Sequence, residues 1–156
     1  MASIHGRTAG NYVAEFEIAQ AADVLFPLFS PEGEKLWMPG WDYENIMGRL
    51  ELNEDDVFVT TSHDHAVNAV IWIVKKYCPE TYEVQLYRVE AEEKVGLVAI
   101  KCHPLGRNST KVRVAYTYIG LSERGRRFIE NFTEEAYQEF IEEWRTLLIE
   151  YFANKL

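Results

Sequence analysis

Histidine is the residue type in this sequence best suited to bind a metal ion, but its spacing argues against such a site. The chain has four histidines. His63 and His65 are two residues apart in the stretch SHDH, so on a strand both point the same way, as a pair of metal ligands requires. No third ligand follows at a suitable spacing, and the polar neighbours Asp64 and Asn68 indicate a turn. We interpret both histidines, and His103 near a strand end, as solvent-exposed.

Cysteine and the acidic residues give no catalytic motif either. Cys78 and Cys102 are too few for a disulfide framework and lack metal-ligand spacing, so two reduced thiols are expected. The sequence contains no nucleophile elbow, zinc-protease helix, phosphate-binding loop or dinucleotide fingerprint. Glu34 could pair with a nearby base or cap a turn, and we assign it no catalytic role. We therefore expect no metal, no cofactor and no catalytic residue.

Aromatic residues with a polar atom suggest binding chemistry instead. A buried phenol needs a hydrogen-bond partner, which a cavity supplies as water or ligand. Simple core packing is the competing interpretation for the tyrosines, as is plugging of a cavity mouth for two of the tryptophans. We predict a ligand cavity of about 300 to 1,000 Å³. The residues expected in its wall or at its mouth are Trp37, Trp41, Trp72, Tyr116, Tyr118, Tyr137, Trp144 and Tyr151.

A long amphipathic helix over residues 133–154 must position several of these side chains. At about 100° per residue, its apolar and aromatic residues cover one arc of roughly 160°. That arc contains Ala136, Tyr137, Phe140, Ile141, Trp144, Leu147, Leu148, Tyr151 and Phe152, and Ile149 alone breaks the division. The helix is about 33 Å long, and a stripe this wide must be buried along that length. Something upstream in the chain must therefore wrap it.

Strands fill most of the chain before this helix. Residues 11–19 alternate between the apolar set Tyr12, Ala14, Phe16 and Ile18 and more polar neighbours, which predicts a half-buried strand. Short helical pieces follow over residues 21–29, and Ser30 caps a second turn. Six more strands are predicted over residues 46–52, 57–62, 67–77, 82–90, 94–103 and 110–121. Consecutive antiparallel strands with the helices gathered apart indicate an α+β fold.

Length and charge limit the classes of protein and partner. The 156 residues, 47% of them hydrophobic, predict one domain over residues 1–156. A net charge of −9 disfavours binding to nucleic acid or anionic membrane surfaces. No stretch approaches 18 apolar residues, so we expect neither a signal peptide nor a membrane span. We expect a cytoplasmic monomer or homodimer.

The stretch FPLFSPEGEKLWMPGW, residues 26–41, resembles the START-like, Bet v 1-like superfamily, also called SRPBCC or polyketide-cyclase-like. The resemblance spans the chain, and it implies a helix-grip fold with a curved sheet around the last helix. It places a set of structural residues at the open end of the sheet and one tryptophan within it. These are Phe26, Pro27, Phe29, Gly33, Glu34, Trp37, Pro39, Trp41 and, in the sheet, Trp72. Members of the superfamily bind or transport lipids, sterols, polyketides and plant hormones, and no universal catalytic residues carry over.

Three functional classes follow from the resemblance and from the aromatic residues. The first is a non-catalytic carrier or sensor of a hydrophobic small molecule such as a lipid, polyketide or aromatic metabolite, and it needs only the cavity. The second is a metal-free enzyme similar to polyketide cyclases and aromatases, which needs an interior acid or base with a shifted pKa. The third is an interaction module similar to the chaperone ATPase activators, which needs an exposed apolar patch. The residues favour the first class.

Overall fold

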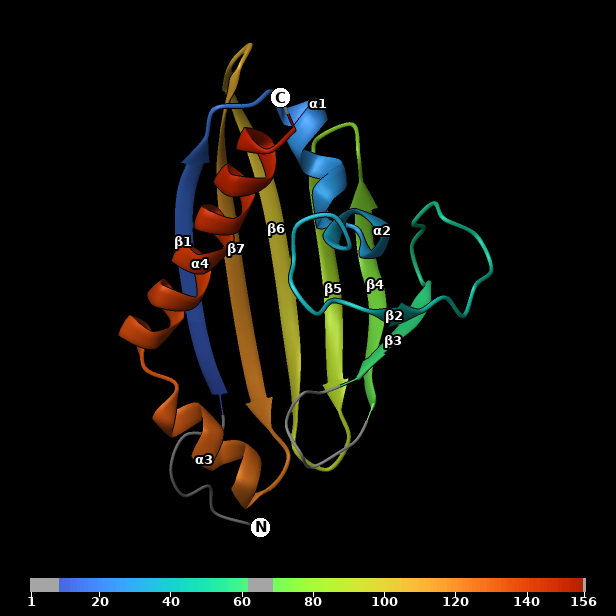
Figure 1. Ribbon diagram of the computed structural model, residues 1–156. Helices are drawn as coiled ribbons and strands as arrows, with labels where there is room; N and C mark the ends of the chain where they lie inside the picture. The colour runs from blue at the N-terminus through green and yellow to red at the C-terminus, as the bar shows by residue number, and fades with distance from the viewer. Residues whose placement is uncertain (1–8, 62–68, 156) are drawn as a thin grey trace.

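The computed structural model describes residues 9–61 and 69–155, and within these residues a seven-stranded sheet is the central element (Figure 1). Every neighbouring pair of strands is antiparallel. The strands are β1 (Ala9–Ile18), β2 (Tyr43–Glu44), β3 (Val57–Thr61), β4 (Ala69–Cys78), β5 (Glu83–Glu90), β6 (Lys94–Gly106) and β7 (Ser109–Gly120). Their order in the sheet is β1-β7-β6-β5-β4-β3-β2, so the first strand pairs with the last.

Five helices accompany the sheet in the described residues, and three of them begin at a capping side chain. They are α1 (Ala22–Leu25), the 3₁₀ helix η1 (Phe26–Phe29), α2 (Pro31–Glu34), α3 (Glu123–Asn131) and α4 (Glu134–Ala153). Ser30, Ser122 and Thr133 each accept a hydrogen bond from a backbone N–H of the following helix, at 3.0, 3.3 and 3.0 Å. None of the helices in the described ranges is long and apolar enough to cross a membrane.

Alternating side chains give the sheet one dry face. On β1 the predicted inward residues are buried, and on β7 the buried apolar and aromatic residues are Val112, Val114, Tyr116 and Tyr118. The two strands pair with Tyr12 opposite Tyr116, so the inward faces of both strands coincide. The expected half-buried antiparallel sheet is confirmed.

Helix α4 lies against this face over β1 and β7, as Figure 1 shows. Tyr137, Ile141, Trp144 and Leu148 are buried along its inner side. The Tyr137 hydroxyl donates to the Val114 carbonyl at 2.7 Å, which ties the helix to β7. Phe140, expected in the buried stripe, is 38% exposed, although its ring still contacts those of Tyr116 and Trp144. The fold is the expected α+β helix-grip arrangement of a curved sheet around a long C-terminal helix.

The strand predicted at residues 46–52 is wrong. This segment forms a loop, and the seventh strand of the sheet is instead the short β2, immediately before it. Asn45 accepts a hydrogen bond from the Gly48 N–H at 3.0 Å, and Gly48 has a φ of 76°, so the chain turns where a strand must extend. The apolar side chains of Ile46 and Leu50 consequently remain exposed.

Helix α2 is held close to η1 by a glycine. A Cβ on Gly33 would lie 2.1 Å from the Pro27 carbonyl oxygen and 2.6 Å from Leu28 Cα, so no larger residue fits without a backbone shift. This close approach orients α2, with Glu34 at its end, toward the dry face of the sheet.

Candidate functional site

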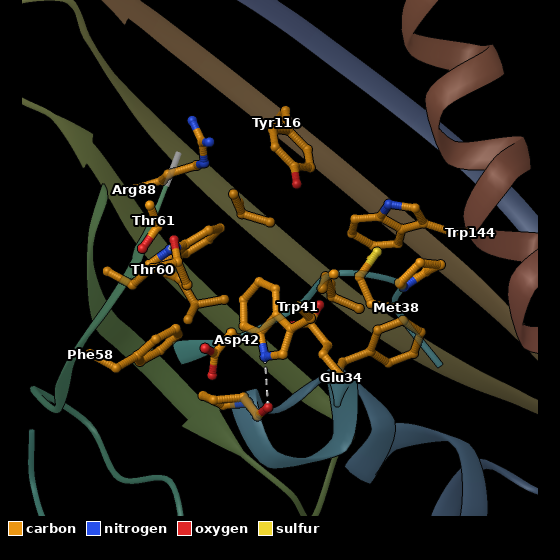
Figure 2. Close-up of a pocket in the computed structure, with 18 of the residues that line it drawn as sticks. Glu34, Met38, Trp41, Asp42, Phe58, Thr60, Thr61, Arg88, Tyr116 and Trp144 are labelled. Atoms are coloured by element: carbon orange, nitrogen blue, oxygen red, sulfur yellow. Dashed lines mark hydrogen bonds between the residues drawn. The ribbon is translucent and has the colours of Figure 1, made fainter. Parts of the chain in front are cut away.

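A cavity of about 470 Å³ lies between the sheet, α2 and α4 (Figure 2). This volume is within the range expected from the sequence and is typical of small-molecule sites. The exposed residues Pro39, Gly40 and Thr61 are part of its lining, so the cavity opens to solvent beside them. Most of the wall is apolar. The apolar lining residues are Phe29, Pro31, Met38, Pro39, Trp41, Phe58, Trp72, Leu86, Val98, Ile100, Phe140 and Trp144.

Four of the eight residues predicted to bind a ligand line this cavity: Trp41, Trp72, Tyr116 and Trp144. The indole N–H groups of two of these residues donate hydrogen bonds within the protein. The Trp41 indole N–H donates to the Pro31 carbonyl at 2.9 Å, the dashed line in Figure 2, and Trp72 donates to the Thr60 hydroxyl at 2.9 Å. These bonds fix both rings in place. Trp72 and Phe58 stack with centroids 5.7 Å apart, so that end of the cavity is a flat aromatic wall.

The other four predicted residues lie elsewhere. Trp37 is buried, its indole N–H donates to the Leu28 carbonyl at 2.7 Å, and its ring meets that of Trp144 edge-on with centroids 5.9 Å apart. Tyr137 is buried with its hydroxyl bonded to β7, and Tyr151 is half-buried beside Phe152. None of these three contributes to the cavity lining.

Tyr118 shares the inward face of β7 with Tyr116 but does not reach the cavity. Its ring packs against Phe128 and Phe132, with centroids 5.3 and 6.2 Å away. Lys94, which is 3% exposed, also faces the Tyr118 ring at 5.7 Å and forms ion pairs with Glu90 and Glu93. The end of the sheet under α3 is therefore packed core.

Glu34 is the cavity residue whose role the sequence did not suggest. Its side chain lines the cavity from the end of α2, and Figure 2 shows it pointing inward. Within the described residues, no hydrogen bond or ion pair reaches its carboxyl group. Burial raises the pKa of Glu34 to about 8, so the carboxyl is largely protonated at neutral pH. Its neighbour Glu32 differs, because the Tyr43 hydroxyl and Lys35 both contact that carboxylate and lower its pKa.

Tyr116 faces Glu34 from the opposite side of the cavity. It is 5% exposed, and in Figure 2 its hydroxyl points into the cavity. Burial raises the pKa of Tyr116 well above its ordinary value, and the nearby Tyr118 and Glu34 add to this shift when they are charged. The phenol is therefore neutral over the whole physiological range.

Arg88 is the cationic side chain of the cavity lining. Its guanidinium forms an ion pair with Glu90 and lies 5.5 Å from the Trp72 ring centroid. The Glu90 carboxylate therefore already compensates the charge of Arg88 within the protein. Asp42, a further charged residue of the lining, lies on the exposed loop at the opening.

The described residues contain no group of three or more His, Cys, Asp or Glu side chains arranged to hold a metal ion. His63 and His65 lie outside these residues. His103 is half-buried on β6, and both cysteines are free thiols, Cys78 half-buried and Cys102 buried.

Comparison with known proteins supports the fold. No protein-family model and no curated protein matches the sequence. Among solved structures, ginseng major latex-like protein 151 from Panax ginseng matches with a TM-score of 0.69 and 16% identity, covering 93% of this chain and 98% of that one. Norcoclaurine synthase from Thalictrum flavum, in complex with dopamine and hydroxybenzaldehyde, matches with a TM-score of 0.62 and 15% identity over 92% and 96% of the two chains.

The chain has the Bet v 1-like fold. A protein from Thermus thermophilus, TTHA0849, is a further structural neighbour, with a TM-score of 0.66 and 15% identity over 91% of this chain and 96% of that one. The fold that the resemblance to the Bet v 1-like superfamily implied is confirmed by the structural neighbours. At these identities the likeness concerns the fold, so the chemistry of the site has to be argued from its own residues.

Proposed function

We propose that this Bet v 1-like protein binds an apolar, partly aromatic small molecule in the cavity between the sheet, α2 and α4. The observation that carries the proposal is the cavity itself, about 470 Å³ with an apolar and aromatic wall and a few polar groups. The lining aromatic rings are held by hydrogen bonds and ring contacts, so the wall is preformed. A preformed wall loses little conformational entropy when a ligand binds.

Equilibrium dialysis with small aromatic ligands tests this proposal. We expect 2-ethylnaphthalene to bind in an equimolar complex and to raise the melting temperature by linkage. Val98→Phe and Ile100→Phe each add a ring at a buried position of the cavity wall and should weaken binding at least tenfold. Val13→Phe adds the same ring at a position of β1 that is 40% exposed, and serves as the control. Folded wall variants that bind as tightly as the wild type would exclude this cavity.

A cyclase-like enzyme is the second candidate, and the observation that favours it is the Glu34 carboxyl in the cavity lining. Intramolecular aldol cyclisation needs an acid near the carbonyl oxygen, and Glu34 is an interior carboxyl that retains its proton near neutral pH. Heptane-2,6-dione is a suitable probe, because its cyclisation forms one carbon–carbon bond and releases one water. A rate above the uncatalysed reaction that Glu34→Gln removes would favour the enzyme, whereas recovery of the unchanged diketone would favour binding alone.

A further inference from the structure

Two polar groups face the cavity without a partner in the part of the chain that the structure describes. Within the described residues, no hydrogen bond reaches the Glu34 carboxyl or the Tyr116 hydroxyl. Two other tyrosines near the site differ, since Tyr137 donates to the Val114 carbonyl and Tyr43 to Glu32. Tyr116 is 5% exposed and lines the cavity, so its hydroxyl can meet water or a ligand there. An unpaired polar group in such a place destabilises the protein unless water or a ligand bonds to it.

Both groups are hydrogen-bond donors at neutral pH. The pKa values of Glu34 and Tyr116 are raised by burial, so the carboxyl and the phenol each carry a proton. They approach the cavity from different elements, Glu34 from α2 and Tyr116 from β7, and both point toward its interior (Figure 2). A phenol and a protonated carboxylic acid can together bind one carbonyl oxygen.

Among residues 9–61 and 69–155, the charged groups near the cavity leave this donor pair available. Arg88 on β5 is paired with Glu90, and on α2 Glu32 is paired with Lys35. Asp42 lies on the exposed loop at the opening. The side chains that η1 and α4 contribute to the lining are Phe29, Phe140 and Trp144, which do not titrate. The Trp144 indole N–H is itself a buried donor with no acceptor among the described residues.

Building on the proposed binding function, we propose that Glu34 and Tyr116 form a polar subsite that binds the carbonyl oxygen of an otherwise apolar, aromatic ketone or related ligand. The aromatic wall holds the apolar body of the ligand. The two donors set its orientation and discriminate against hydrocarbons of the same shape. An ammonium group in place of the carbonyl is disfavoured, because its protons would face the donors of the subsite.

Three probes of one shape test this subsite: 2-acetylnaphthalene, 2-ethylnaphthalene and 1-(2-naphthyl)ethylamine. Their affinities for the full-length protein are measured by equilibrium dialysis at pH 6.5 and at pH 9.5. At pH 6.5 the ketone should bind about tenfold more tightly than the hydrocarbon, the value of one net hydrogen bond. At pH 9.5 this preference should fall to what the Tyr116 hydroxyl alone provides, because an ionised Glu34 carboxylate cannot donate. The affinity of the hydrocarbon should change little between the two pH values.

Two conservative variants separate the donors. Tyr116→Phe removes only the hydroxyl and should lower the ketone affinity several-fold while leaving the hydrocarbon affinity unchanged. Glu34→Gln keeps a donor that cannot ionise, so the ketone preference should persist at pH 9.5. Tyr43→Phe is the matched control, because that hydroxyl already bonds to Glu32 and does not line the cavity. It should leave all three affinities unchanged.

The outcomes separate this subsite from the proposed function. Equal and measurable binding of ketone and hydrocarbon overturns the subsite and leaves the cavity as a binding site. Tightest binding of the amine, lost in Glu34→Gln, overturns it as well, because Glu34 then acts as a carboxylate. If none of the three probes binds, the proposed function fails together with the subsite.

Discussion

Glu34 shows how burial gives two neighbouring carboxyl groups opposite properties. Glu32 and Glu34 belong to the same turn of α2, but Lys35 and Tyr43 contact Glu32, whereas the Glu34 side chain lines an apolar cavity. The pKa of Glu32 is therefore lowered and that of Glu34 is raised to about 8. Nothing in the sequence spacing distinguishes the two residues, because the difference depends on which side of α2 faces the sheet.

Replacing Glu34 should change how stability depends on pH. The unfolded carboxyl titrates near 4.5 and the folded one near 8, so between these values the folded state binds more protons and stability falls as pH rises. Glu34→Gln removes this loss. Its free energy of unfolding relative to the wild type should be higher at pH 8.5 than at pH 5, by on the order of 1 to 2 kcal/mol for a half-buried group. Urea denaturation at the two pH values measures the difference.

Glu32→Gln is the matched control for this prediction. The pKa of Glu32 is lowered by its partners, so its contribution to stability is present above the unfolded pKa and is lost as pH falls. Glu32→Gln should therefore not stabilise the protein at pH 8.5. An effect of Glu34→Gln that is the same at both pH values would show that the Glu34 carboxyl is not buried as described.

At the scale of the elements, the helices that cover β7 determine where the cavity ends. Tyr116 and Tyr118 are two residues apart on β7, so both point to the dry face. Phe128 of α3 and Phe132 just after this helix cover Tyr118, whereas Tyr116 lies beside Trp144 of α4 and reaches the cavity. The helix that covers a given residue therefore decides whether an inward tyrosine packs in the core or lines the cavity.

Trp144 is the side chain that links α4 to the cavity, and its removal should destabilise the fold. It is 4% exposed and its ring contacts those of Phe29, Trp37 and Tyr116. Trp144→Ala should lower the free energy of unfolding by about 3 to 5 kcal/mol, as for other buried large aromatics. Ile149→Ala, at a position of the same helix that is 44% exposed, should cost within about 0.5 kcal/mol. A loss below about 1 kcal/mol for Trp144→Ala, measured by denaturant unfolding, would mean that the ring is not part of the core.

At the scale of the whole molecule, periodicity predicted the fold better than the site. The period of residues 133–154 identified α4 to within one residue at each end, and alternation identified the inward faces of β1 and β7. The strand expected at residues 46–52 was wrong because the turn at Asn45 and Gly48 outweighs the apolar residues around it. Local patterns show which face of an element is buried, but not which other element covers it. The sequence alone therefore did not show that Trp37 and Tyr137 lie away from the cavity, or that Glu34 lines it.

The most direct test of the proposed binding site is an NMR measurement on the methionine methyl groups. Of the three methionines in the chain, Met38 lines the cavity, whereas Met47 is 42% exposed on the loop after β2. Protein with ¹³C-labelled methionine methyl groups is saturated with 2-acetylnaphthalene, and Met47→Leu assigns the signals. We predict intermolecular nuclear Overhauser effects from the naphthyl protons to the Met38 methyl group and none to that of Met47. Saturation of the protein without any contact at Met38, or with contact at Met47 alone, would contradict ligand binding in this cavity.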